Sequence, residues 1–207
     1  MEKTEVALIK KSDMTLVGQE VSLNDKQLQF ILKKTPTQYI KQRPAKGGGK
    51  WSYVSGSYVR KCLNLMFGWD WDFEILDEKI MIECKEVIVK GRLTCRSAGR
   101  TIVKTQYGNK DIMFRKGSEV PLSIGNDMKA AATDALKKCA AELGIAQDVY
   151  HPDEFREVKI APTIEVGSDK WKKAVQAIKD GSITVEQLSQ NYDLSEEQLK
   201  MLGDEGV

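Results

Sequence analysis

The glycine-rich stretch Lys46-Gly47-Gly48-Gly49-Lys50 is the first candidate for a phosphate-binding site. A Walker loop has four residues between its first glycine and its Gly-Lys pair, and a Ser or Thr after the lysine. Here Pro44 occupies the position of the first glycine, and Trp51 follows the lysine. The stretch therefore does not predict ATP binding. Flexible amides and cations followed by aromatic residues fit a nucleic-acid backbone with stacked bases, although a solvated surface loop has the same composition.

Side chains for acid–base, nucleophilic or metal chemistry are scarce. His151 is the only histidine, so no histidine-based triad can form. Asp70, Asp72 and Glu74 alternate along one expected strand and have the charge for Mg²⁺, but solvated strand acids are more common and no fourth ligand is evident. The cysteines form no CxxC pair, which indicates free thiols in a reducing compartment and no zinc site: Cys62, Cys84, Cys95 and Cys139. We expect no catalytic residue, metal or cofactor.

Three groups of cations remain as candidate polyanion sites. The first surrounds the glycine loop and precedes Tyr53: Lys41, Arg43, Lys46 and Lys50. The second is Lys137-Lys138 near the end of a long expected helix, and the third is the strand face of Lys90, Arg92 and Arg96. Adjacent helical residues diverge by about 100°, so at most one of the two helical lysines is expected to face a sheet. An ordinary solvated face remains the alternative for the second and third groups.

The charge is unevenly distributed along the 207 residues. Residues 1–145 contain 25 Lys and Arg against 17 Asp and Glu, residues 146–167 contain 2 against 5, and residues 168–207 contain 5 against 8. A basic body with an acidic C-terminal part suggests a polyanion-binding portion joined to one that binds no polyanion. No apolar run has the length of a membrane helix, and the start MEKTEVALIKK is too charged for a secretory signal.

Capping residues and periodicity predict the elements that must position these cations. A helix is expected to start near 22–25, and a short one after Thr35-Pro36 that ends near Arg43-Pro44, followed by the glycine loop. An amphipathic helix is expected over 55–67 and a long alanine-rich one over 122–143. Strands are expected over 69–75, from about residue 79, and over 101–107, which gives an antiparallel meander. The predicted class is therefore α+β, an antiparallel β-β-β-α core with a long helix packed on the sheet.

The acidic, proline-containing segment 146–167 has the composition of a linker. Three helix starts follow it, at Ser168, Thr184 and Ser195. Their apolar residues are enough for a miniature core, which predicts a small C-terminal helical module. We therefore expect a DNA-binding domain over 1–156, a linker over 157–167 and a partner-docking module over 168–207.

The order of these parts resembles that of a known family. In the N-terminal half the residues that carry the resemblance are Tyr39-Ile40, Arg43, the triple glycine, Tyr53, Gly56, Met66-Phe67-Gly68 and Trp71. In the long helix they are Ala131 or Ala132, Thr133-Asp134, Leu136-Lys137-Lys138 and the closing Gly144. Over about residues 22–156 the chain resembles the N-terminal domain of the Rad fifty-two single-strand annealing proteins, in a compact form that suggests a phage or prophage member.

The resemblance implies a ring of subunits that binds single-stranded DNA in a basic groove. By position, the inner groove would hold phosphates on Arg43, Lys50, Tyr53, Lys137 and Lys138, whereas Ala141 stands where the family has a further basic residue. A weaker second site would use Lys46, Lys85, Lys116 and Arg156. The implied activity is ATP-independent annealing of complementary strands in recombination and repair, by a protein that is not an enzyme and works in the bacterial cytoplasm. The acidic module would bind a phage exonuclease or the host single-strand-binding protein.

Two other functions stay open on the sequence alone. The C-terminal module has the helix count of a helix-turn-helix reader of duplex DNA, but its net negative charge argues against binding a duplex. An accessory subunit of a recombination nuclease is the other alternative, and the missing catalytic motifs disfavour it.

Overall fold

The computed structural model describes residues 6–11, 23–45 and 47–205. Ser22 and Lys46, named above in a helix start and in the glycine loop, lie outside the described residues. Contacts divide the chain into two units, Ser22–Arg156 in one and Met1–Val21 with Glu157–Val207 in the other. Each unit is described by itself below.

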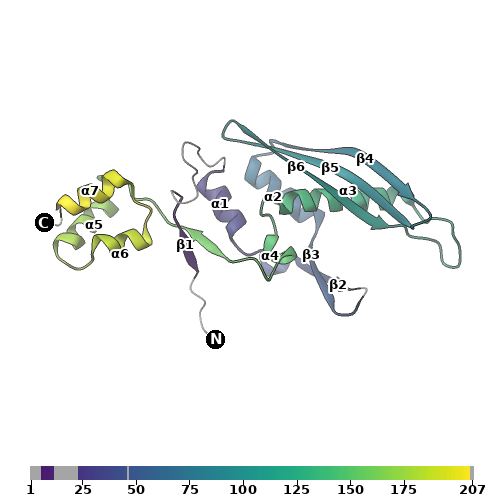
Figure 1. Cartoon of the computed structure of the whole chain (residues 1–207), viewed down its shortest axis with the longest axis horizontal. Coiled ribbons are helices and arrows are strands. Elements are labelled where there is room, and N and C mark those ends of the chain that lie inside the picture. Colours follow the sequence, from purple (N-terminus) through teal and green to yellow (C-terminus); the bar gives the residue numbers. More distant parts are fainter. Residues whose placement is uncertain (1–5, 12–22, 46, 206–207) are drawn as a thin grey trace. The chain divides into compact units, whose positions relative to one another are not determined.

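The larger unit is built on an antiparallel sheet with the order β4-β5-β6 (Figure 1). Its strands are β4 (Trp71–Met81), β5 (Glu86–Ser97) and β6 (Arg100–Asp111). The prediction that a second strand begins near residue 79 is wrong, because β4 continues to Met81 across a bulge at Ile75/Asp77. The bulge inserts an extra residue, which interrupts the alternation on which the shorter strand was based. The three-strand meander and the α+β class are confirmed.

The long helix α3 (Ile124–Ala141) packs along β5 and β6 (Figure 1). Ser123 caps it, and Ala131 and Ala135 are fully buried against the sheet. A Cβ atom added at Gly108 of β6 would lie 2.1 Å from the backbone nitrogen of Ala135. Small residues on both surfaces therefore allow the helix backbone to approach the strand closely.

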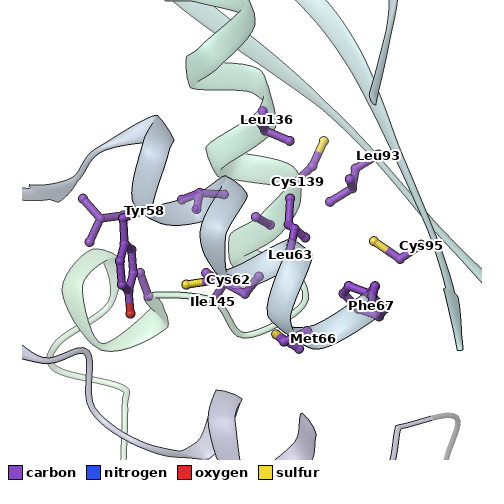
Figure 2. Packing of buried hydrophobic residues seen from close by; sticks show 14 of the residues in the cluster. Tyr58, Cys62, Leu63, Met66, Phe67, Leu93, Cys95, Leu136, Cys139 and Ile145 are labelled. Atoms are coloured by element: carbon purple, nitrogen blue, oxygen red, sulfur yellow. The ribbon is translucent and has the colours of Figure 1, made fainter. Parts of the chain in front are cut away.

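Helix α2 (Gly56–Phe67) covers the other end of the same core. Ser55 caps it through the amide of Tyr58, and Gly68 ends it in the left-handed conformation, as expected. Its apolar side, which includes Leu63, faces α3 and β5. Figure 2 shows Leu63 in one buried cluster with Cys139 of α3 and Leu93 of β5.

The segment before α2 differs from the expectation. Helix α1 (Asp25–Leu32) begins after the cap Asn24, but the expected short helix is only the 3₁₀ turn η2 (Thr37–Tyr39). It leads into an antiparallel hairpin of β2 (Ile40–Pro44) and β3 (Lys50–Val54). The hairpin forms because Gly48 and Gly49 adopt positive φ angles that let the chain reverse tightly.

The first part of the acidic segment belongs to the core. Ile145, Ala146 and Val149 are buried in the same cluster as residues of α2 and α3, and Val149 belongs to the short helix α4 (Gln147–Tyr150). The expectation of a linker from residue 146 is therefore wrong. The buried side chains of Ile145 and Val149 hold this segment in place. The acidic residues around them gave the segment the composition of a linker.

The smaller unit contains a strand pair and three helices. β1 (Ala7–Ile9) pairs in parallel with β7 (Val158–Ile160), a pairing between distant segments that no local pattern predicted. The helices α5 (Asp169–Lys179), α6 (Val185–Asn191) and α7 (Glu196–Glu205) follow the predicted starts at Ser168, Thr184 and Ser195. Where a linker over 157–167 was expected, the chain forms β7 and supplies Ile164 to the small core around Trp171 and Leu202. No helix in the described part of the chain is both long and apolar enough to cross a membrane.

The thiols differ in exposure, and this gives a first testable prediction. Burial raises the pKa of Cys62 and Cys139, and raises that of Cys95 to about 12, whereas Cys84 is exposed in the turn between β4 and β5. Only the thiolate is nucleophilic, so we expect one thiol to react rapidly with an aromatic disulfide reagent at about pH 8. All four should react in denaturant. A Cys84→Ser variant that still shows a rapid phase would contradict the burial of the other three.

Candidate nucleic-acid interface

The β2–β3 hairpin presents one cationic and aromatic face. Arg43 is the register partner of Trp51, and Lys41 is that of Tyr53, so these four side chains share a face of the hairpin. The guanidinium carbon of Arg43 lies 5.9 Å from the centre of the Tyr53 ring. Trp51 is 61% exposed. An exposed indole beside a guanidinium offers one group for stacking a base and one for holding a phosphate.

Lys50, another cation of the glycine loop, is not on this face. Lys50 is the register partner of Pro44, and strand alternation places it on the side of β3 that carries the buried Val54. Lys46 lies outside the described residues, so its place in the second site stays a prediction.

A hollow of about 500 Å³ lies along α3. We call it the helix groove, and it is lined by Gln106, Asp134, Lys137, Lys138, Ala141, Glu142, Gln147, Tyr150 and His151. The structure thus brings both predicted helical lysines to one groove, although only one was expected to face the sheet. Ala141, where the resemblance calls for a basic residue, forms part of the same wall.

Asp134 explains why adjacent lysines reach one groove. Its carboxylate oxygens lie 3.4 Å from Nζ of Lys137 and 3.3 Å from Nζ of Lys138, three and four residues further along the helix. The side chain of Lys137 is 19% exposed and that of Lys138 is 50% exposed. One carboxylate therefore draws both lysine side chains to the same place and neutralises part of their positive charge.

Tyr150 connects the helix groove with the hairpin. Burial raises the pKa of its phenol, and the backbone of Val54 at the end of β3 lowers it; the carboxylate of Asp134 raises it and the guanidinium of Arg43 lowers it by smaller effects. The phenol oxygen is buried and has no hydrogen bond of normal geometry among the described residues. Tyr150 thus lines the helix groove while its helix α4 lies against β3 of the hairpin.

Two contacts anchor the chain on either side of the hairpin, one at α3 and one at α4. A Cβ added at Gly56, two residues after β3, would lie 2.4 Å from Cγ2 of Thr133, so only glycine permits this approach of α2 to α3. On the other side of the hairpin, the backbone amide and the hydroxyl of Thr35 donate to the carboxylate of Asp148 on α4, at 2.8 and 2.6 Å. The chain is thus anchored just before β2 and just after β3.

The candidates for a second site are dispersed. Lys85 lies in the β4–β5 turn with its ammonium 5.4 Å from the centre of the Phe114 ring, and the exposed Lys116 lies in the loop that follows Phe114. Arg156 donates to the backbone carbonyls of Asp153 and Phe155. The first two are near one end of the sheet, and the third is at the end of the larger unit.

The third cationic group is largely neutralised. Arg96 pairs with Asp70 and Asp72 at 3.1 and 2.9 Å, and Arg92 approaches Glu74 at 3.7 Å. The acids considered above as Mg²⁺ ligands are thus the cross-strand partners of arginines. Paired charges at the sheet surface leave little net field for a polyanion.

The structure adds residues that the sequence analysis did not place in the site. Arg43 and Trp51 share a hollow of about 400 Å³ with Pro44, Asn109, Lys110 and Asp111. The sequence could have pointed to Lys110. It continues the alternation of Lys104, Gln106 and Gly108 along β6 beyond the expected end of the strand. No sequence pattern pointed to Tyr150, since its segment was expected to be a linker.

The chain matches a protein-family model over most of its length. Residues 24–163 match the model described as Rad52/22 family double-strand break repair protein. No curated protein matches the chain. The matched range contains the hairpin, the sheet, α3 and α4, and therefore every residue of the two hollows described above.

Proposed function

This chain belongs to the Rad52/22 family of double-strand break repair proteins, and from that premise we propose that it binds single-stranded DNA and anneals complementary strands without ATP. The observation that carries the proposal is the shared neighbourhood of the hairpin and the helix groove. Tyr150 lines the helix groove with Lys137 and Lys138, its helix α4 lies against β3 of the hairpin, and the charges of Arg43 and Asp134 both act on its phenol.

The proposed mechanism is the positioning of one strand. Arg43, Lys137 and Lys138 hold phosphates, and Trp51 and Tyr53 provide surfaces on which bases stack. Contacts to the backbone leave the base edges accessible, so a second strand can test its complementarity. Annealing makes and breaks no covalent bond, so the proposed activity is not enzymatic and requires neither a metal nor a nucleotide cofactor.

Assembly into a homo-oligomeric ring is part of the proposal. A single subunit offers few phosphate contacts, and repeating them around a ring would increase the affinity by avidity. The order β4-β5-β6 leaves β4 as an edge strand, and its side chains Ile75, Leu76 and Ile80 are 52, 39 and 45% exposed. Unprotected apolar edge strands favour association with another chain.

We further propose that residues 168–207 dock a partner rather than DNA. Their net negative charge repels phosphate, and their helices pack around a core of their own. A phage exonuclease or the host single-strand-binding protein is the partner that we propose, for a phage-encoded protein acting in the bacterial cytoplasm.

The carboxylate within the groove gives a second testable prediction. Asp134→Asn removes the negative charge that competes with phosphate for Lys137 and Lys138, so it should tighten binding to single-stranded DNA about threefold at low salt. Fluorescence anisotropy with labelled oligothymidine measures this. Glu74→Gln, which removes a carboxylate paired with Arg92 on the sheet, is the matched control and should change affinity little. Weaker binding of the Asp134 variant would contradict competition.

A gel assay with the full chain separates the proposal from its rivals. Two complementary labelled oligonucleotides, mixed with the chain in EDTA and without ATP, should form duplex faster than they do alone. A regulator of duplex DNA would instead bind preformed duplex more tightly than either strand. A nuclease subunit would shorten the labelled strand when Mg²⁺ is restored. Either of these two results, without accelerated annealing, would overturn the proposed function.

A further inference from the structure

The smaller unit has a groove between α5 and α6 with a volume of about 930 Å³. Volumes of this size lie within the usual range of ligand-binding clefts. Its lining comes from both helices, from the loop between them, from Tyr192 after α6 and from the segment that precedes α5.

The floor of the groove is apolar. Ile164, Ala174 and Leu188 are at most 8% exposed, and Ile183 and Tyr192 are partly buried beside them. Ala177 adds only a methyl group at the α5 wall, which leaves the space between the helices open. An apolar side chain that enters here would exchange water for contact with side chains that are already packed.

The rim of the groove is basic within an acidic module. Lys170 and Lys173 are exposed, and neither pairs with a carboxylate among residues 6–11, 23–45 and 47–205. Residues 168–207 carry 8 Asp and Glu against 5 Lys, yet not one Asp or Glu lines the groove. The side-chain amide of Gln190 adds hydrogen-bonding capacity for an extended backbone. The electrostatic character of the groove is thus opposite to that of the module that carries it.

We propose that this groove binds a short acidic segment of a partner protein, with one apolar side chain inserted between α5 and α6 and carboxylates on Lys170 and Lys173. The inference rests on the docking role proposed above and assigns to it a site and a ligand chemistry. Single-stranded DNA fits less well, because the groove offers only two cations and a mainly aliphatic floor, whereas DNA binding relies on rows of cations and exposed aromatic rings.

Anisotropy titrations of the full chain test the proposal. The probe is a labelled synthetic peptide of Asp and Gly with a single Phe, and the comparison probes are the same peptide with Ala for Phe and labelled oligothymidine. The variants are Lys170→Ala/Lys173→Ala and Ala177→Phe, which fills the groove without changing its charge. Lys179→Ala/Lys200→Ala removes the same charge elsewhere in the module and is the matched control. Circular dichroism verifies that each variant is folded.

We expect saturable binding of the Phe peptide at low salt, about tenfold weaker after either groove substitution or after loss of the Phe, and unchanged in the control. Absence of saturable binding to the unmodified chain, or equal affinity in all variants, would overturn the proposal. Loss of oligothymidine binding in Lys170→Ala/Lys173→Ala would also overturn it, in favour of a nucleic-acid site. Peptide binding without any oligothymidine binding would instead support the groove while contradicting the proposed annealing function.

Discussion

Reversing two charges of the candidate interface, Arg43→Glu with Lys138→Glu, should weaken binding to single-stranded DNA about a hundredfold at low salt. Each substitution removes a cation that faces phosphate and adds an anion that repels it, and about 1.4 kcal/mol for each change corresponds to this factor. Arg43 and Lys138 are both exposed. The carboxylate of Asp134 competes only partly with phosphate for Lys138. The effect is therefore expected in affinity and not in folding.

The salt dependence of binding gives the same prediction a second readout. The slope of the logarithm of the binding constant against that of salt should become less steep by about 0.7 for each lost phosphate contact. Lys26→Glu with Arg100→Glu makes the same change of charge at exposed positions, one in α1 and one at the start of β6, outside both hollows. An equal loss of affinity in this control would mean that net charge, and not the interface, controls binding.

Gly108→Ala should reduce the free energy of unfolding by about 3 kcal/mol or more. The added Cβ would lie 2.1 Å from the backbone nitrogen of Ala135 and 2.2 Å from the carbonyl oxygen of Ala131, so α3 must move away from β6. Overpacking of a core against backbone typically costs about 1–3 kcal/mol and occasionally more, and backbone atoms have little freedom to yield. Urea denaturation followed by circular dichroism measures the change.

Gly125→Ala is the matched control for this substitution. Gly125 lies in the first turn of the same helix, and a Cβ there meets no atom within 4 Å. Its free energy of unfolding should stay within about 1 kcal/mol of the parent, with a small increase because alanine favours helix. If Gly108→Ala were equally harmless, the close packing of α3 on β6 that shapes the helix groove would be wrong.

The sequence predicted the elements whose patterns are local. α2, α3 and the helices of the smaller unit follow from capping residues and apolar spacing, and the meander follows from alternation. The β2–β3 hairpin could not be predicted because Thr35-Pro36 has the signature of a helix start, while exposed strand residues such as Gln42 and Arg43 show no alternation of apolar and polar types. The parallel pairing of β1 with β7 joins segments about 150 residues apart, so it depends on tertiary structure alone.

The candidate site was predicted in its residue types but not in its construction. The sequence predicts Arg43, Tyr53, Lys137 and Lys138, and the structure brings the first two to the hairpin face and the last two to the helix groove. Lys50 could not be assigned to the opposite face without the register of the hairpin. The role of Asp134 depends on the approach of Lys137 and Lys138 to one carboxylate, which helical spacing permits but does not require. The roles of all these residues in binding DNA stay predictions.

Photo-crosslinking tests most directly whether single-stranded DNA lies between the hairpin and α3. Oligonucleotides that carry 5-iododeoxyuridine are bound to the full chain and irradiated, and the crosslinked peptides are identified by mass spectrometry. We expect crosslinks in peptides that contain Trp51, Tyr53 and Tyr150, and their loss in Arg43→Glu/Lys138→Glu at the same DNA concentration. Crosslinks confined to residues 168–207, or to the outer sheet face around Tyr107, would contradict the account.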